Sequence, residues 1–174
     1  MATEIEFSRP FALADVGERE AVIEIAAEAH ERAALARRFG LLALDALAAT
    51  VRLRRVGGGA VSVDARCVAE VVQACIVTLE PVASRIEDSW EVTFAPPGTA
   101  ARADVTVGWD DDEPEPLTGD AIDVGEVVAA HLGIALNPYP RRPGAVFSAP
   151  PAEGGEDPSA ASAFGVLGGL VRKS

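Results

Sequence analysis

The chain has 174 residues, of which 49% are hydrophobic and 5% aromatic, and it carries a formal net charge of −12 at pH 7. This length predicts one domain whose core is built from aliphatic side chains, and the apolar content excludes disorder throughout. The acidic charge opposes non-specific nucleic-acid binding. No apolar run approaches the roughly 18 residues that a membrane span needs, and the first residues lack the pattern of a signal peptide, so we expect a cytoplasmic protein.

The first predicted elements are a strand and a helix. Residues 20–25 are rich in β-branched side chains, which predicts a strand with the segment around Ile5 and Phe7 as its neighbour. Residues 27–39 are rich in helix formers and stop at Gly40, which predicts a helix. A helix this short needs support from packing, which we expect from its apolar side chains Ala27, Ala34, Leu35 and Phe39.

Three alternating segments predict strands in the middle of the chain. Residues 49–56 and residues 61–71 alternate apolar and polar side chains, and Gly57–Gly59 reverses the chain between them. A phosphate-binding glycine loop is followed by a helix, and because a strand follows here, we interpret the triplet as a hairpin turn. Residues 84–94 alternate again. One further strand is predicted around Val105, Val107 and Trp109.

The second helix is predicted over residues 123–136. Asp123 and Glu126 have the spacing of a capping box, and Pro138 forbids continuation of the helix. Its apolar face, which we expect against the sheet, consists of Val124, Val127, Val128, His131, Leu132 and Ala135.

These elements predict an α+β fold, with a mainly antiparallel curved sheet or open barrel, two substantial helices and a flexible C-terminal tail. We place a single α+β domain at residues 1–145. Residues 146–174 are dominated by Ala, Pro, Gly and Glu without periodicity, which predicts a tail that either ends in a short helix or stays disordered to its end.

The charged residues form separate blocks along the chain. Residues 28–66 hold seven arginines, whereas residues 110–126 hold eight carboxylates and no basic residue. The prolines of residues 138–143 keep the backbone extended, so Arg141 and Arg142 lose little entropy on binding. Our candidate contacts to RNA or another partner are Arg37, Arg38, Arg52, Arg54, Arg55, Tyr139, Arg141 and Arg142. Our candidate contacts to a basic partner are Asp110, Asp111, Asp112 and Glu113.

No constellation of residues is typical of catalysis or of metal binding. The two histidines are His30, predicted at the surface, and His131, predicted as a packed and hydrogen-bonded residue. Cys67 and Cys75 have no zinc-site spacing, and in one strand they would lie roughly 26 Å apart, so we expect two reduced, packed thiols. We expect no catalytic residue, metal, cofactor or small-molecule substrate. A hydrolase that uses metal bound by the carboxylates of residues 110–126 is a distant alternative.

Two segments together resemble the signatures of one protein family. They read Q-A-C-I-V-T-L-E-P-V at residues 73–82 and I-D-V-G-E-V-V-A-A-H-L-G-I-A-L-N-P-Y-P-R-R-P-G-A at residues 122–145. Both are similar to motifs of the YceD family of large ribosomal RNA subunit accumulation proteins. Residues 31–41 and the terminal A-F-G-V-L also resemble segments of alphaproteobacterial members.

The resemblance implies a bacterial, non-enzymatic factor that supports synthesis, processing or stability of 23S ribosomal RNA by binding. Its partners would be a precursor of the large ribosomal subunit, its RNA, a basic ribosomal protein, or several of these. The alternative is a protein-only adaptor or chaperone for a small basic ribosomal protein, without direct contact to RNA. No catalytic residues come with the resemblance.

The chain departs from the family pattern at three positions. Many members have C-x-x-C in the first motif, whereas this chain has Cys75 and Thr78, which argues against a metal or redox role. Asn137 and Ala130 stand where relatives often have acidic residues. Any partner contact that relatives make through acidic residues at these two positions is therefore not expected in this chain.

Overall fold

The centre of the molecule is an open five-stranded sheet. The computed structural model describes residues 5–17, 19–96 and 114–147. The strands lie in chain order, and neighbours pair antiparallel except for the last two, which pair parallel. They are β2 (Ala21–Ala26), β3 (Ala43–Arg55), β4 (Val61–Ala74), β5 (Pro81–Ala95) and β6 (Glu115–Pro116). A second sheet pairs β1 (Pro10–Ala12) with β7 (Ala121–Asp123).

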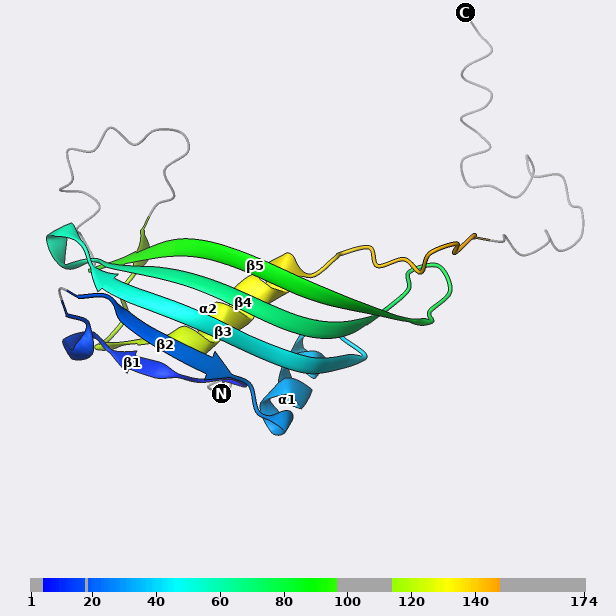
Figure 1. Ribbon diagram of the computed structural model, residues 1–174, viewed down its shortest axis with the longest axis horizontal. Helices are drawn as coiled ribbons and strands as arrows, with labels where there is room; N and C mark the ends of the chain where they lie inside the picture. Colours follow the sequence, from blue (N-terminus) through cyan, green and yellow to red (C-terminus); the bar gives the residue numbers. More distant parts are fainter. Residues whose placement is uncertain (1–4, 18, 97–113, 148–174) are drawn as a thin grey trace, which may run out of the picture.

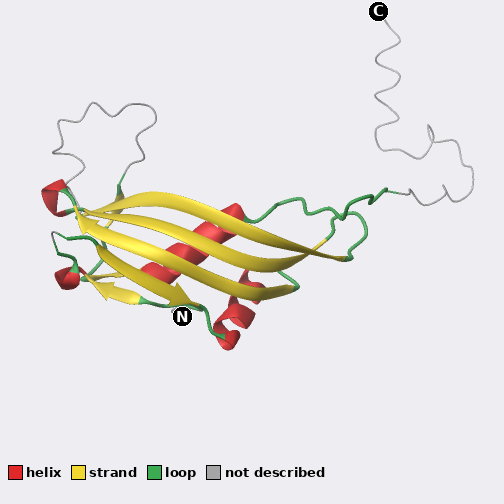
Figure 2. Cartoon of the chain, viewed as in Figure 1, coloured by secondary structure: helices red, strands yellow, loops and turns green. Residues whose placement is uncertain are grey.

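Two α-helices accompany the sheet within the described residues. Figure 1 shows α2 (Val124–Ala135) lying diagonally across one face, and α1 (Ala29–Phe39) at the end of the sheet where β3 begins. Figure 2 shows that the sheet is curved and stays open. The predicted α+β class, with a mainly antiparallel curved sheet, is therefore confirmed. Neither described helix is long and apolar enough to cross a bilayer.

The core lies between α2 and the concave face of the sheet. Alternation along β3 and β4 turns Val51, Leu53 and Val63 to this face, where each is at most 1% exposed. From α2, Val128 and Leu132 pack against them and are fully buried. Burying an aliphatic side chain of this size contributes about 1.5–3 kcal/mol, so this layer provides most of the driving force for folding.

The long hairpin has the predicted turn but a longer first strand. Gly58 and Gly59 have φ values of 73° and 80°, a left-handed conformation that glycine adopts without strain. β3 begins at Ala43, before the predicted start, and its register shifts between Leu44 and Ala46. This bulge interrupts the alternation in an alanine-rich stretch, which is why the pattern missed the first half of the strand.

Two sequence-based expectations about the N-terminal half need correction. The segment around Ile5 and Phe7 is not the neighbour of β2, which pairs with β3. Phe7 is instead fully buried as part of the core. α1 begins two residues later than predicted because Glu28 is its N-cap, and the Glu28 N–H donates to Glu31 at 2.7 Å.

Candidate functional site

Most of the arginines predicted to contact a partner are not free. Arg38 donates to both carboxylate oxygens of Glu126 at 2.9 and 2.7 Å, and to Glu6 at 3.1 Å. It therefore ties α1 to the first turn of α2. Arg37, its neighbour, is exposed and makes no ion pair with any described residue. The carboxylate of Glu126 raises the pKa of Arg38 further above its usual value.

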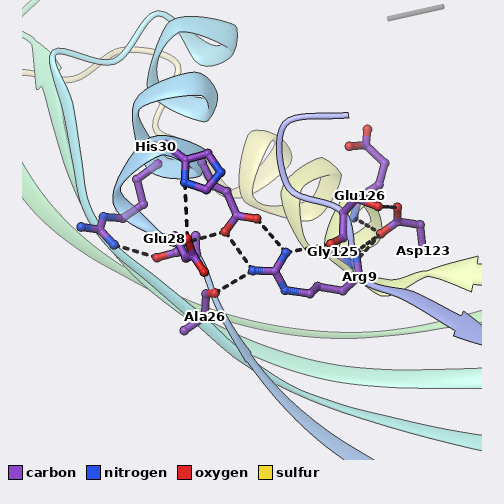
Figure 3. Close-up of polar contacts among 11 residues, drawn as sticks. Arg9, Ala26, Glu28, His30, Asp123, Gly125 and Glu126 are labelled. Carbon is purple, nitrogen blue, oxygen red and sulfur yellow. Dashed lines mark hydrogen bonds and ion pairs between the residues drawn. The ribbon is translucent and has the colours of Figure 1, made fainter. Parts of the chain in front are cut away.

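A second polar network joins the N-terminal segment to α1 and α2. Figure 3 shows Arg9 reaching from the N-terminal segment, where its guanidinium donates to both oxygens of Glu31 at 2.7 and 2.9 Å. Asp123 caps α2 as predicted, because its carboxylate accepts hydrogen bonds from the backbone of Gly125 and Glu126. The Glu126 side chain does not complete the predicted capping box and binds Arg38 instead. These contacts hold the N-terminal segment and both helices together.

The arginines of β3 also fail to form a basic patch. Arg55 donates to the carbonyl oxygens of Val16 at 2.6 Å and Leu13 at 2.5 Å. Arg54 lies 3.6 Å from Glu91, and Arg52 is exposed without an ion pair to any described residue. Thirteen residues of strand span roughly 40 Å, so these arginines lie at the far end of β3 from α1.

The sheet face turned away from α2 carries charges of both signs. Arg66 pairs with Glu87 at 3.2 Å, and Arg85 pairs with Glu70 at 2.8 Å. Opposite charges also alternate across the strands, as at the facing positions Arg52 and Asp64. A mixed surface of this kind attracts a phosphate backbone much less than a basic one.

The structure brings the two family-like segments together into one surface. The turn between β4 and β5 carries the first segment, and the chain after α2 carries the second. Gln73 Nε2 donates to the Asn137 carbonyl at 2.9 Å, and the Ile76 N–H donates to the Pro140 carbonyl at 2.9 Å. Arg142 pairs with Glu80 at 2.6 Å. Three contacts therefore fix the proline segment against the turn.

Cys75 is the centre of this junction. Its side chain is fully buried, and its Sγ accepts a hydrogen bond from the Arg142 N–H at 3.4 Å. Hydrogen bonds from the Arg142 backbone and from Thr78 lower the pKa of the Cys75 thiol to about 6. Both cysteines are free, as expected. Because Cys75 is buried, its thiolate is a structural hydrogen-bond acceptor rather than an exposed nucleophile.

Apolar and aromatic side chains project from the joined segments. Leu79 is 77% exposed and has a φ of 61°, a left-handed conformation that is rare for leucine. Its N–H donates to the Cys75 carbonyl at 2.9 Å, which closes the turn. Ile76 and Tyr139 are also exposed, at 44% and 71%. Arg141 is exposed without an ion pair to any described residue.

We call Ile76, Leu79, Tyr139 and Arg141 the motif surface. The turn exposes a leucine and an isoleucine, and the segment held against it exposes an aromatic ring and an arginine without an ion pair to any described residue. Such side chains are typical of a binding surface. The sequence pattern predicts Tyr139, Arg141 and Arg142 as contacts here but gives no role to Ile76 or Leu79. The resemblance in residues 73–82 was the signal that could have pointed to them.

The two histidines lie in different surroundings. His131 stacks on Trp90 with ring centroids 4.2 Å apart and is half-buried, so burial lowers its pKa. It is packed, as predicted, although its partner is a ring. His30 is exposed, 3.4 Å from Glu28. Among the described residues, no three His, Cys, Asp or Glu side chains are placed to hold a metal ion.

Several candidate residues lie outside the described part of the chain. These are the acidic candidates Asp110, Asp111, Asp112 and Glu113, the predicted strand around Val107, and residues 148–174 of the predicted tail. Their predicted roles remain predictions.

Comparison with known proteins identifies one family. The family model described as "Large ribosomal RNA subunit accumulation protein YceD" matches residues 63–167, which include both segments of the motif surface. No curated protein matches the chain, and no solved structure does.

Proposed function

The chain belongs to the YceD family of large ribosomal RNA subunit accumulation proteins, and from this we propose that it is a non-enzymatic factor that binds a precursor of the large ribosomal subunit. Binding supports the synthesis, processing or stability of 23S ribosomal RNA in the cytoplasm. The family fits a role in accumulation of this RNA, and the binding mechanism is our proposal. We propose no catalytic residue and no cofactor.

The observation that carries this proposal is the junction between the two family segments. Hydrogen bonds join Gln73 to Asn137 and Ile76 to Pro140, and the two residues of each pair lie 64 positions apart in the chain. The parts that meet are the turn at residues 75–80 and the chain after α2 at residues 137–143, and neither part contributes to the sheet–helix core. This contact is therefore not needed to bury apolar surface there. A preordered, exposed surface instead lowers the entropy lost on binding.

The motif surface has side chains that suit RNA in a partly folded particle. Tyr139 offers an exposed ring on which an unpaired base can stack, and Arg141 offers phosphate a guanidinium that no described residue pairs with. The acidic charge elsewhere on the chain opposes indiscriminate binding to RNA. We therefore propose a local contact at this end of the molecule and assign no RNA-binding role to the bound arginines Arg38 and Arg55.

Gene deletion followed by complementation tests this function. We expect deletion to lower the ratio of mature 23S to 16S RNA. The wild-type gene should restore this ratio, whereas a double variant, Tyr139→Ala with Arg141→Ala, should restore it only in part, because a lost stacking contact costs about 1–3 kcal/mol. The matched control is Arg52→Ala, which removes an exposed arginine from the outer sheet face and should complement fully. An unchanged ratio after deletion would rule out the proposed function.

A protein-only adaptor remains the second candidate, and two observations favour it. The chain carries a net charge of −12, and two of the four motif-surface side chains, Ile76 and Leu79, are aliphatic. Such side chains suit a protein partner. Pull-down from lysate with and without nuclease separates the candidates, because contact through RNA is lost after digestion and contact with a basic ribosomal protein is not.

A further inference from the structure

Among the described residues, one edge of the main sheet is unpaired along most of its length. β5 runs from Pro81 to Ala95, and among the described residues its outer side pairs only at Phe94 and Ala95, with β6. Figure 1 shows β5 as the outermost long strand on its side of the sheet. An exposed edge of this length presents unpaired backbone donors and acceptors to any extended chain that reaches it.

Two hydrogen bonds show which backbone groups of β5 point outward. The Ala95 carbonyl accepts from Leu117 N–H at 2.8 Å, beyond the edge, and the Ser89 N–H donates to the carboxylate of Asp88 at 2.9 Å. Backbone groups alternate in direction along a strand. The N–H and carbonyl groups of Glu87 and Glu91 therefore also face outward, where no described strand pairs with them.

A groove lies at the end of this edge where β6 pairs, between β5, β6, β7 and α2. Its volume is about 290 Å³, and its lining includes Val92 and Phe94 from β5 and Val127, Ala130 and His131 from α2. Both β5 side chains are half-buried. A strand added to β5 would turn every second side chain into this groove, because side chains alternate between the two faces of a sheet.

The charged residues that line the groove are all acidic. Its described lining includes Glu115, Asp123 and Glu126 but no arginine or lysine. Asp123 and Glu126 are occupied by the helix cap and by Arg38, whereas exposed Glu115 has no ion pair to a described residue. Asp88, like Glu115, lies close enough to His131 to act on its titration. These two carboxylates favour a positively charged occupant.

One buried polar group beside the groove also lacks a partner. The Nε1 of Trp90 is shielded from solvent, and no described residue accepts a hydrogen bond from it. Its ring stacks on His131, which lines the groove. A buried donor without an acceptor is costly, by about 1–3 kcal/mol, so a ligand that brings a carbonyl oxygen here would gain binding energy.

We propose that the outer edge of β5 and the groove beside it bind an extended, basic segment of a partner protein as an added strand. Backbone hydrogen bonds to the outward groups of Glu87 and Glu91 align the segment, and its alternate side chains enter the groove. Its basic side chains lie near Asp88 and Glu115. The proposal goes beyond the proposed function, because it concerns a surface separate from the motif surface and is tested without any ribosomal particle.

Amide hydrogen exchange of the full chain provides the first test, with the short peptide Arg-Val-Arg-Val-Arg-Val-Arg as the probe. We expect the outward amides of Glu87 and Glu91 to exchange fast in the free chain. With saturating peptide, their exchange should be at least about tenfold slower. The inward amides of Ile86 and Trp90 are the control and should stay slow throughout. Slow exchange of Glu87 and Glu91 in the free chain would overturn the proposal, since another part of the chain or a second copy would then cover the edge.

Two substitutions with matched controls provide the second test, read out as the affinity for the same peptide. Ala130→Arg fills the groove and Glu115→Arg reverses its free charge, so each should weaken binding at least about tenfold. Their controls are Ala33→Arg on α1 and Glu24→Arg on β2, which are also exposed positions and should bind as the wild type does. Loss of binding in the controls instead, or equal binding of a Glu-Val peptide, would overturn the proposal.

Discussion

At the scale of single residues, the difference between bound and free arginines decides where partners can be contacted. Arg37 and Arg38 are adjacent and were predicted to have the same role, yet Arg38 binds Glu126 and Glu6 while Arg37 is free within the described residues. The partners of Arg38 lie 32 and 88 residues away in the chain. No local pattern encodes such a pairing, which is why sequence analysis could not separate the two.

These neighbours give a matched pair for a stability measurement. Arg38→Ala removes the bidentate ion pair between Arg38 on α1 and Glu126 on α2, so we expect the free energy of unfolding to fall by about 1 kcal/mol. Arg37→Ala removes an exposed side chain without an ion pair and should change it by less than about 0.5 kcal/mol. Urea unfolding of both variants measures the difference. Equal effects would contradict the assignment of Arg38 to structure rather than to partner binding.

The Cys75 thiol predicts a pH dependence of stability. Its folded-state pKa of about 6 lies below the unfolded value of roughly 8.5. Stabilisation by the thiolate is therefore fully present above the unfolded pKa and is lost as pH falls through the folded pKa. The advantage of the wild type over Cys75→Ser in free energy of unfolding should grow as pH rises from 6 to about 8.5.

Cys67 is the control for this measurement because its pKa shifts the other way. Burial raises the pKa of the Cys67 thiol. Its contribution is present below the unfolded pKa and is lost at higher pH, so the advantage over Cys67→Ser should not grow between pH 6 and 8.5. An advantage over Cys75→Ser that is constant across this range would contradict the hydrogen-bonded thiolate.

At the scale of elements, strands with unbroken alternation were predictable, whereas the first half of β3 and the shortest strands were not. β4 and β5 bury one face each, so alternation shows in the sequence over ten residues or more. β1, β6 and β7 have two or three residues each and leave no periodic pattern. The junction of the motif surface is made largely by backbone atoms, such as the Pro140 carbonyl and the Arg142 N–H, which no side-chain pattern encodes.

The contact between α2 and the N-terminal segment depends on a glycine. A Cβ at Gly125 would lie 2.4 Å from the carbonyl oxygen of Phe7 and 3.0 Å from the nitrogen of Arg9. Gly125→Ala should therefore lower the free energy of unfolding by about 1–3 kcal/mol, as overpacking against backbone does. Gly57→Ala is the control, because its Cβ would meet nothing within 4 Å. Thermal unfolding that shifts equally in both variants would contradict this close approach.

At the scale of the whole molecule, the two proposed binding functions lie on separate surfaces. The outer sheet face is a mixture of charges, the motif surface lies at one end, and the open edge of β5 lies along one side. Because the surfaces are separate, an acidic chain can still bind an RNA-rich particle through one local surface. The overall charge opposes non-specific binding to RNA, and we propose that the small motif surface makes the specific contact.

Sedimentation of cell extracts through a sucrose gradient tests the central claim most directly. The account predicts that the wild-type chain co-sediments with precursors of the large ribosomal subunit. The double variant Tyr139→Ala with Arg141→Ala should shift to the top of the gradient, whereas Arg52→Ala should stay with the precursors. A wild-type chain that remains at the top of the gradient, or a double variant that sediments as the wild type does, would contradict binding through the motif surface.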